Sequence, residues 1–347
     1  TSNTTGTANV ACGRATLYTN TTGADNTAVG TNALLSNTTG GQNTAIGALA
    51  LDANTTASYN TSVGYGSLSS NTTGNANTAV GGNALVTNST GSGNTAMGYK
   101  ALDTNSTGIH NTAIGAYALD ANTTGQLSTA VGYESLYSNT TGSSNQAFGR
   151  RALYLNTTGT ENSAFGYLAM DSNTTGSYNV AMGVNALGSN TTGATNTAVG
   201  VTALGAATTA GDNTAVGYDT ARQTTTGHSN AALGRSALDA NTTGNENTAC
   251  GHYALVSNTT ASRNTGIGRG ALDSITTGGN NTGVGWYAGD AATTAAGAVF
   301  VGYNSGQGST TAHQQVALGF ETTAQNIDGS VTIGGSVTSA SSSTRYI

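Results

Sequence analysis

The feature that most constrains this chain is a repeat of seventeen residues. Glycine recurs at this spacing nineteen times in succession, from Gly13 to Gly319, and leucine keeps the same step from Leu17 to Leu272 with two exceptions. A unit of this length is too short for a pair of helices, but it suits one coil of a parallel β-solenoid, in which equivalent residues stack about 4.8 Å apart. The sequence therefore predicts an all-β fold, a parallel β-roll of about nineteen coils.

The repeat also divides the chain. Residues 1–323 keep the register and are predicted to form one continuous solenoid, whereas after Gly319 the step shortens to fifteen residues, at Gly334. Residues 324–347 are therefore predicted to be a C-terminal transition or cap. The chain starts at Thr1 already in register, without Met. We expect a processed chain or a fragment, whose first coil continues into further sequence or docks on another copy.

Within each coil we expect two short strands. In the coil Asn26–Gln42, Asn-Thr-Ala-Val is the first strand, Gly30 the bend, Ala-Leu the second strand and Asn-Thr-Thr-Gly a return turn, where Asn and Gly tolerate positive φ. The apolar residue before each glycine and the leucine are predicted to form core ladders, with members Val29, Ile46, Val80, Leu34, Leu51 and Leu85. Cys12 and Cys250 share the first of these columns and are expected to be buried hydrophobes, too far apart to pair.

Composition agrees with stacked coils and excludes several functions. Charged residues are 7% of the chain and proline is absent. Like charges repeated every 4.8 Å would repel, at about 1 kcal/mol per contact even in water, whereas stacked Thr and Asn can exchange hydrogen bonds. Lys100 is the only lysine and the arginines are scattered, so binding to nucleic-acid phosphates is not expected. No apolar run has the length of a membrane span.

The small core predicts association between chains. Each coil offers about four core residues, such as Ala28, Val29, Ala33 and Leu34, and their burial stabilises less than the ordering of seventeen residues costs. We therefore expect burial between copies, as a homotrimer or as a head-to-tail homopolymer.

No cofactor, metal site or catalytic group is predicted. His228 and His313 share a column but lie five coils apart, and no phosphate-binding G-x-x-x-x-G-K-[ST] loop occurs. The carboxylates are too scattered to form an acid–base pair. We therefore expect that the chain is not an enzyme.

The Asn-Thr-Thr turns open N-x-T sequons. Candidate glycan-bearing or turn-forming residues include Asn20, Asn37, Asn54, Asn71, Asn122 and Asn139. The second Thr of the turn is kept in every coil, whereas Asn is replaced at Ala207, Ile275 and other positions. This pattern favours a structural threonine ladder, with Asn shaping the turn.

The residue after each repeat glycine is a candidate recognition column. Its aromatic members include Tyr65, Tyr99, Tyr133, Tyr167, Tyr218, Trp286 and Tyr303, with Arg14, Arg150, Arg235 and Arg269 among them. Aromatic and Arg side chains carry much of the binding energy at protein surfaces. We predict that this column either recognises a host surface glycan or receptor, or contacts a neighbouring chain.

The unit Asn-Thr-Ala-Val-Gly-x-x-Ala-Leu, as in Asn26–Leu34 and Asn77–Leu85, resembles the head repeats of trimeric autotransporter adhesins. It is similar also to repeat arrays of phage tail fibres. The resemblance covers about residues 3–323 and implies a parallel β-roll, often left-handed and trimeric, that serves as a shaft or receptor-binding rod. The adhesin repeat is usually shorter than seventeen residues.

Together these observations predict an extracellular, non-enzymatic fibre shaft or filament subunit with an adhesive role, on a cell surface or a virion. One alternative is a solenoid that binds ice or carbohydrate through an exposed Thr or aromatic ladder. The adjacent threonines of the turn argue against ice, since in an extended segment they point to opposite faces. The other alternative is a fibre-borne depolymerase, which would need two carboxylates converging in a cleft.

Overall fold

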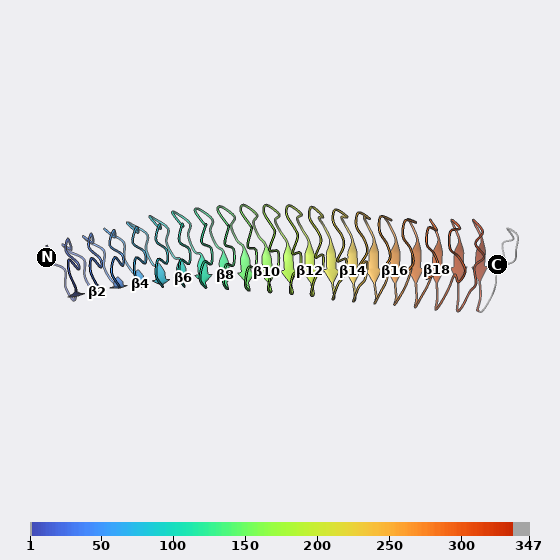
Figure 1. Cartoon of the computed structure of the whole chain (residues 1–347), viewed down its shortest axis with the longest axis horizontal. Coiled ribbons are helices and arrows are strands. Elements are labelled where there is room, and N and C mark those ends of the chain that lie inside the picture. Colours follow the sequence, from blue (N-terminus) through green and yellow to red (C-terminus); the bar gives the residue numbers. More distant parts are fainter. Residues whose placement is uncertain (1, 336–347) are drawn as a thin grey trace. The chain divides into compact units, whose positions relative to one another are not determined.

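The computed structural model describes residues 2–335, and it is built of β-solenoid coils (Figure 1). The chain divides into two compact units, unit 1 from Thr1–Thr175 and unit 2 from Gly176–Ile347. Each coil contributes one strand of three residues, and the remaining residues of the coil form turns and bends. The parallel β-solenoid of about nineteen coils that the repeat predicts is confirmed.

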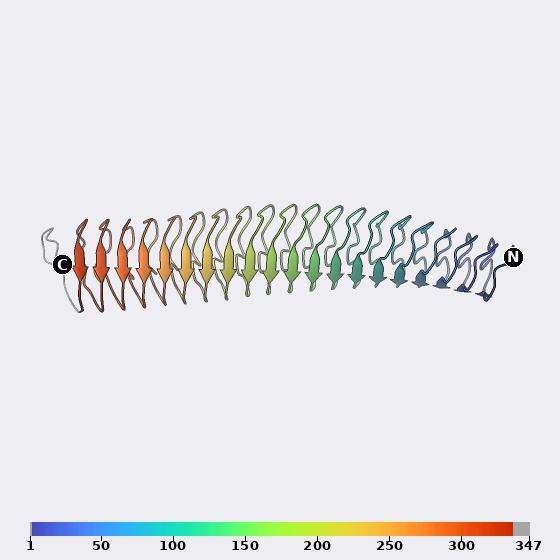
Figure 2. The ribbon, with the colours of Figure 1, turned by 180° about the vertical axis from the view of Figure 1, so that it is seen from behind.

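Unit 1 contains ten strands that pair in chain order. They are β1 (Val10–Cys12), β2 (Thr27–Val29), β3 (Thr44–Ile46), β4 (Thr61–Val63), β5 (Thr78–Val80), β6 (Thr95–Met97), β7 (Thr112–Ile114), β8 (Thr129–Val131), β9 (Gln146–Phe148) and β10 (Ser163–Phe165). Every neighbouring pair is parallel, and the partners are seventeen residues apart, as in Ala28 with Ala45. Figure 2 shows these strands side by side with their arrows in one direction.

Unit 2 repeats this arrangement. Its strands are β11 (Val180–Met182), β12 (Thr197–Val199), β13 (Thr214–Val216), β14 (Ala231–Leu233), β15 (Thr248–Cys250), β16 (Thr265–Ile267), β17 (Thr282–Val284), β18 (Val299–Val301), β19 (Val316–Leu318) and β20 (Val331–Ile333). The last pair aligns Val316 with Val331, fifteen residues on. The segment predicted as a transition or cap thus adds a parallel strand, and its residues 336–347 lie outside the described residues.

The interior of the coils is narrow and in most of them filled by small residues and leucine, with Met170 and Phe300 as larger exceptions. The middle residue of the strand points inward, so that Ala28 and Ala45 are fully buried. Leu34, Leu51 and Leu85 are also fully buried, as their repeat predicts.

The predicted core position of the residue before the glycine is wrong. Val29 and Ile46 are 37% and 41% exposed, and Val80 is half-buried. Successive side chains of a strand point to opposite faces, and because alanine faces inward, both of its neighbours face outward. Cys12, which is exposed, and Cys250, which is half-buried, lie in this same outward column.

The predicted second strand is also absent from the described coils, because Ala-Leu lies in a turn. Leu34 has a φ of 48°, and Asn32 and Gln42 have φ values of 58°. A left-handed conformation costs a residue with a Cβ about 1–2 kcal/mol, and the full burial of Leu34 offsets that cost. The Asn-Thr-Thr-Gly turns have no positive φ in residues 2–335, contrary to expectation.

Glycine is required where the chain leaves the strand. Gly47 has a φ of 136°, and a Cβ there would overlap the carbonyl oxygen of Gly64 in the next coil. Few other residues reach this φ, and none could accept that contact. This double constraint accounts for a glycine that never misses a coil.

Two ladders of buried asparagines connect successive coils. Asn37 donates through Nδ2 to Oδ1 of Asn20, at 2.8 Å, and to the carbonyl of Gly40, at 2.9 Å. Asn26, from the second ladder, donates to the same Gly40 carbonyl at 2.9 Å and accepts the backbone N–H of Asn43 at 3.0 Å. Buried polar groups are costly unless they are paired, and here each amide pairs within its own coil and with a neighbouring coil.

The asparagine ladder should tolerate no buried charge. Asn105 donates to Asn88 and Gly108 and accepts from Asn122. Asn105→Asp removes both donated bonds and leaves an uncompensated carboxylate, so we expect the free energy of unfolding at pH 7 to fall by about 3 kcal/mol. The control Thr107→Asp, at an exposed position of the same turn, should change it by less than about 0.5 kcal/mol. Urea unfolding followed by circular dichroism measures both, and equal effects would contradict a buried ladder.

Candidate functional site

The outward side chains of the strands form the first candidate surface. We call it the strand face, and it consists of the first and third residue of every strand. The third residues are Cys12, Val29, Ile46, Val63, Val80, Met97, Ile114, Val131, Phe148 and Phe165 in unit 1. In unit 2 they are Met182, Val199, Val216, Leu233, Cys250, Ile267, Val284, Val301, Leu318 and Ile333. All are apolar, and no strand of residues 2–335 places a charged residue in either outward column.

Much of this apolar surface is accessible in the single chain. Met97 is 43% exposed, Met182 48% and Leu233 53%. The rings of Phe148 and Phe165 stack on each other with centroids 4.8 Å apart and planes inclined by 5°. A contiguous apolar surface of this kind marks an interaction site more often than single exposed hydrophobic residues do. The seventeen-residue repeat shows this apolar column in the sequence, but its residues were predicted to lie in the core.

The aromatic column of unit 1 lies at the surface, immediately after the bend. Tyr65 is 62% exposed, Tyr99 49%, and Tyr133 and Tyr167 45% each. Tyr117, in the adjacent column, sets its ring nearly perpendicular to those of Tyr99 and Tyr133, with centroids 5.5 and 6.2 Å away. Edge-to-face contacts of this type stabilise the orientation of each ring.

Unit 2 carries a comparable column. Its members Tyr218, Trp286 and Tyr303 are 51%, 46% and 42% exposed. The guanidinium of Arg269 lies 5.3 Å from the Trp286 ring centroid, and that of Arg235 lies 5.7 Å from the Tyr218 ring. Both units therefore present a row of exposed aromatic and cationic groups. Whether this column recognises a ligand or a neighbouring chain stays a prediction.

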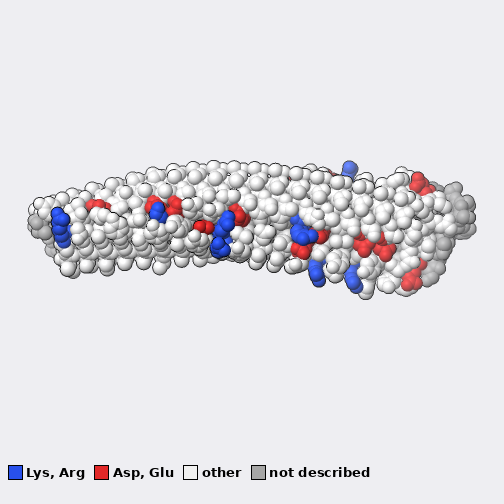
Figure 3. All heavy atoms as spheres, viewed as in Figure 1, with Lys and Arg blue, Asp and Glu red and all other residues white. Residues whose placement is uncertain are grey.

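Charges of opposite sign lie together. Lys100 contacts Asp103 at 3.4 Å, and Arg151 contacts Asp171 at 3.2 Å. In Figure 3 some groups of charged side chains contain both signs and others a single sign, with uncharged surface between the groups. That phosphate backbones are not bound stays a prediction.

Asp120 is the most perturbed titratable group of unit 1. Burial, and secondly the charge of Asp103, raise its pKa to about 6, and the nearby Lys100 opposes the shift. One of its carboxylate oxygens is buried and accepts no hydrogen bond. Burial also raises the pKa values of Asp52 and Asp171 in the same column. The sequence placed these aspartates in one column but gave no sign that the column is half-buried.

The predicted sequon asparagines have a structural role. Asn37, Asn54, Asn71, Asn122 and Asn139 are fully buried, and Asn20 is 1% exposed. In each of these residues Nδ2, the atom to which a glycan would be attached, donates hydrogen bonds inside the coil. The glycan-bearing interpretation is therefore wrong for the folded coils, and these residues belong to the ladder.

The threonine ladder exists, but it uses the first Thr of the turn. The hydroxyl of Thr38 donates to the carbonyl of Thr55 in the next coil at 3.0 Å, and Thr21 does the same to Thr38 at 3.0 Å. The second Thr, such as Thr39, is exposed. The ladder was predicted because this second Thr is kept in every coil, but the first Thr of the turn makes the hydrogen bonds.

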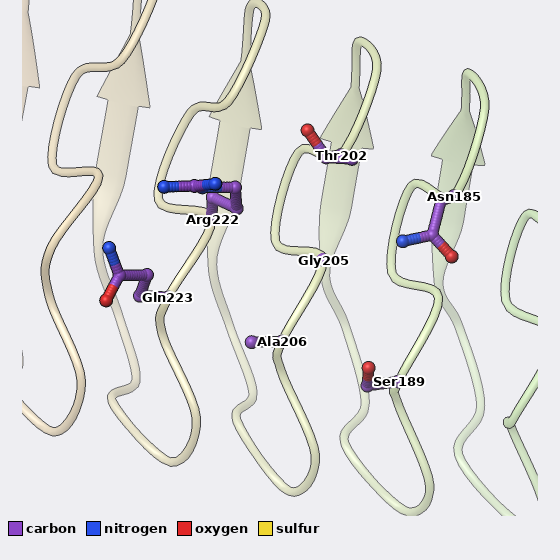
Figure 4. A pocket seen from close by; sticks show the side chains of 7 residues that line it. All are labelled: Asn185, Ser189, Thr202, Gly205, Ala206, Arg222 and Gln223. Atoms are coloured by element: carbon purple, nitrogen blue, oxygen red, sulfur yellow. The ribbon is translucent and has the colours of Figure 1, made fainter.

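Three surface hollows differ in the groups that line them. One in unit 2, of about 320 Å³, is lined by Asn185, Ser189, Thr202, Gly205, Ala206, Arg222 and Gln223. Figure 4 shows Asn185 and Arg222 on opposite sides, with Gly205 and Ala206 between them. Arg222 donates to Asp239 at 3.0 and 3.3 Å, which neutralises its charge. The other hollows contain His228 and Glu246, or Leu17 and Asn20. None of the three is lined by two carboxylates.

No protein-family model matches the chain, and no curated protein sequence matches it. Among the described residues, no cluster of three or more His, Cys, Asp or Glu side chains could hold a metal ion. Nor do these residues form any helix with the length and hydropathy that crossing a bilayer requires.

The raised pKa of Asp120 predicts a dependence of stability on pH. Between its ordinary value of 3.8 and about 6, the folded state binds a proton that the unfolded state does not, so stability is greatest below pH 4 and falls as the pH rises through 6. Asp120→Asn should therefore raise the melting temperature by about 2 °C at pH 7.5 and leave it unchanged at pH 4. Asp25→Asn, at an exposed tip, controls for the loss of one negative charge. The same increase at both pH values would contradict the assignment.

Proposed function

We propose that this chain is a non-enzymatic structural segment of an extracellular fibre, assembled as a homo-oligomer through the strand face. The observation that carries the proposal is that every strand turns an apolar residue outward, without a charge in either outward column. A chain under selection only for solubility would be expected to place charges on such a face. Burial against another copy explains their exclusion.

The energetics support association along many coils. An outward Val or Ile that is about 40% exposed gains on the order of 1 kcal/mol when a partner covers it. Ten strands per unit then give about 10 kcal/mol per unit before the cost of association is subtracted. No single coil needs a strong contact, because the contacts add along the stack.

The identity of the side chains favours copies of this chain over ice. An ice lattice is regular and would favour a uniform column, but the third strand residue changes from Val29 to Met97 to Phe148. In most strands the two outward residues are a Thr and an apolar residue, rather than two Thr in a T-x-T pattern. In parallel, in-register copies related by cyclic symmetry, each Phe148 would contact the Phe148 of another copy. A column of varying side chains would therefore still pack against an identical column. A homotrimer, which the repeat resemblance also implies, satisfies this condition.

The location and the adhesive role rest on different support. The repeat resembles those of bacterial and phage surface fibres, which act outside the cell. A single lysine and eight arginines in 347 residues leave few sites for trypsin-like proteases. The buried asparagines are occupied by structural hydrogen bonds, and the three hollows lack a carboxylate pair, which supports a structural rather than a catalytic role.

Charges on the strand face should dissociate the assembly. We expect the unsubstituted chain to sediment as an oligomer, and Ile46→Glu with Val80→Glu to sediment as a monomer of 34.0 kDa, because two buried carboxylates per chain would lack partners. The control pair is Thr39→Glu with Thr73→Glu, at exposed turn positions, and it should remain oligomeric. Sedimentation velocity distinguishes these outcomes. A monomeric parent chain, or dissociation by the control pair alone, would overturn the proposal.

A further inference from the structure

The exposed tyrosines of unit 1 recur with a period of two coils. Tyr65, Tyr99, Tyr133 and Tyr167, which we call the tyrosine row, alternate with Gly82, Ala116 and Arg150 in the same column. The ring of Tyr99 leans over Gly82, because a Cβ added there would lie 3.7 Å from a ring atom. Gly82 and Ala116 are small spacers, and about half of the surface of each tyrosine remains exposed.

The period of the row matches a particular ligand. Two coils correspond to about 10 Å along the stack. In an extended chain of β-1,4-linked pyranoses each sugar is turned over relative to its neighbour, so every second sugar presents the same face at nearly this interval. That face carries C–H groups and is apolar enough to stack on an aromatic ring. We propose that the tyrosine row binds a neutral β-1,4-linked polysaccharide lying along the stacking direction of unit 1.

The polar groups beside the row fit hydroxyl-rich, uncharged sugars. The charged residues that flank the row are Lys100, Arg150, Arg151, Asp103, Asp120, Glu134 and Asp171. Three positive charges stand beside four negative ones, and two of the cations are already paired, with Asp103 and with Asp171. Arg150 lies between two rings of the row, 5.9 Å from the centroid of Tyr133 and 5.7 Å from that of Tyr167. Its N–H groups can donate to sugar hydroxyls where the chain passes over it.

These charges also distinguish the row from the strand face. A second copy of this chain would have to desolvate Lys100, Glu134 and Arg150, and charged residues are depleted at the centres of protein interfaces. A hydrated polysaccharide leaves them in contact with water. The inference therefore assigns a different partner to a different surface and does not depend on the oligomer.

Unit 2 shows this alternation in part. Tyr218, His252, Trp286 and Phe320 are also spaced by two coils, and Arg235 and Arg269 occupy two of the coils between them, but Tyr303 occupies the coil between Trp286 and Phe320. The Trp286 ring lies 5.9 Å from that of Tyr303. The uninterrupted alternation is therefore a feature of the tyrosine row in unit 1, where we place the polysaccharide.

The proposal is tested by retention of the full chain on microcrystalline cellulose and on chitin, both β-1,4-linked. Granular starch, which is α-1,4-linked and does not extend in the same way, is the geometric control. We expect binding to cellulose, to chitin or to both, and none to starch. Binding to only one of the two identifies the substituent that the row accepts. Retention on neither, or equal retention on starch, would overturn the proposal.

Variants then locate the site. Tyr99→Ala with Tyr133→Ala should weaken binding by about tenfold or more, and Tyr99→Phe with Tyr133→Phe, which keeps both rings, should remain within about twofold. The matched control is Tyr18→Ala with Tyr59→Ala, since these tyrosines are 55% and 64% exposed in the same unit but lie outside the row. Circular dichroism verifies that every variant is folded.

Three results would reject the assignment to the row. The alanine pair could bind as well as the parent chain, the control pair could lose binding equally, or the phenylalanine pair could fail to restore it. If the alanine pair instead changes the sedimentation of the chain, a second copy occupies the row, and the proposed ligand is wrong. Failure of this proposal leaves the test of the strand face unaffected, because that test uses other residues and another readout.

Discussion

The hydrogen bonds that buried asparagines make between successive coils are the interaction on which the rest of the structure depends. Backbone N–H groups also link the coils outside the three-residue strands, as those of Leu34 and Ser36 do with the carbonyls of Ala50 and Asp52, but alanine and leucine give each coil only a small core. The amides of Asn26 and Asn37 converge on one carbonyl, that of Gly40, and reach the neighbouring coils as well. Such a network is stable only when nearly all members are paired, which explains why the same residues return every seventeen positions.

Because the asparagine ladders satisfy the buried polar groups inside the coils, the outward side chains can vary from one coil to the next. Two surfaces result, and their chemistry is opposite. At every strand of residues 2–335 the strand face carries an apolar third residue and no charge, which suits burial between identical chains. From Tyr65 to Tyr167 the column after the bend alternates aromatic with small or cationic residues and is bordered by charges of both signs, which suits a hydrated, uncharged polymer. The same solenoid can therefore assemble through one surface and bind through another.

The period alone was sufficient to predict the coil, its parallel stacking and the burial of Leu34. It could not predict which side of the strand faces inward, since Ala28 and Val29 are both apolar and the larger residue was the better candidate for a core. The narrow coil favours alanine there; where Phe300 takes the inward position, Gly289 and Gly306 occupy the leucine column and leave space for its ring. The burial of Asn37 was equally hidden, because Asn-Thr-Thr is typical of a turn or a glycan site. Its regular recurrence at two positions per coil was the available signal. The left-handed φ of Leu34 contradicts its conformational preference, and only tertiary packing accounts for it.

The central claim is that the strand face is buried between copies of this chain. Electron cryo-microscopy of the unsubstituted protein tests it most directly, through the cross-section perpendicular to the stacking direction of the coils. The account predicts several solenoids per cross-section, with the strands of each facing the common centre and the tyrosine row on the outside. A single solenoid with its strands in contact with solvent, or copies joined through the tyrosine row, would contradict it.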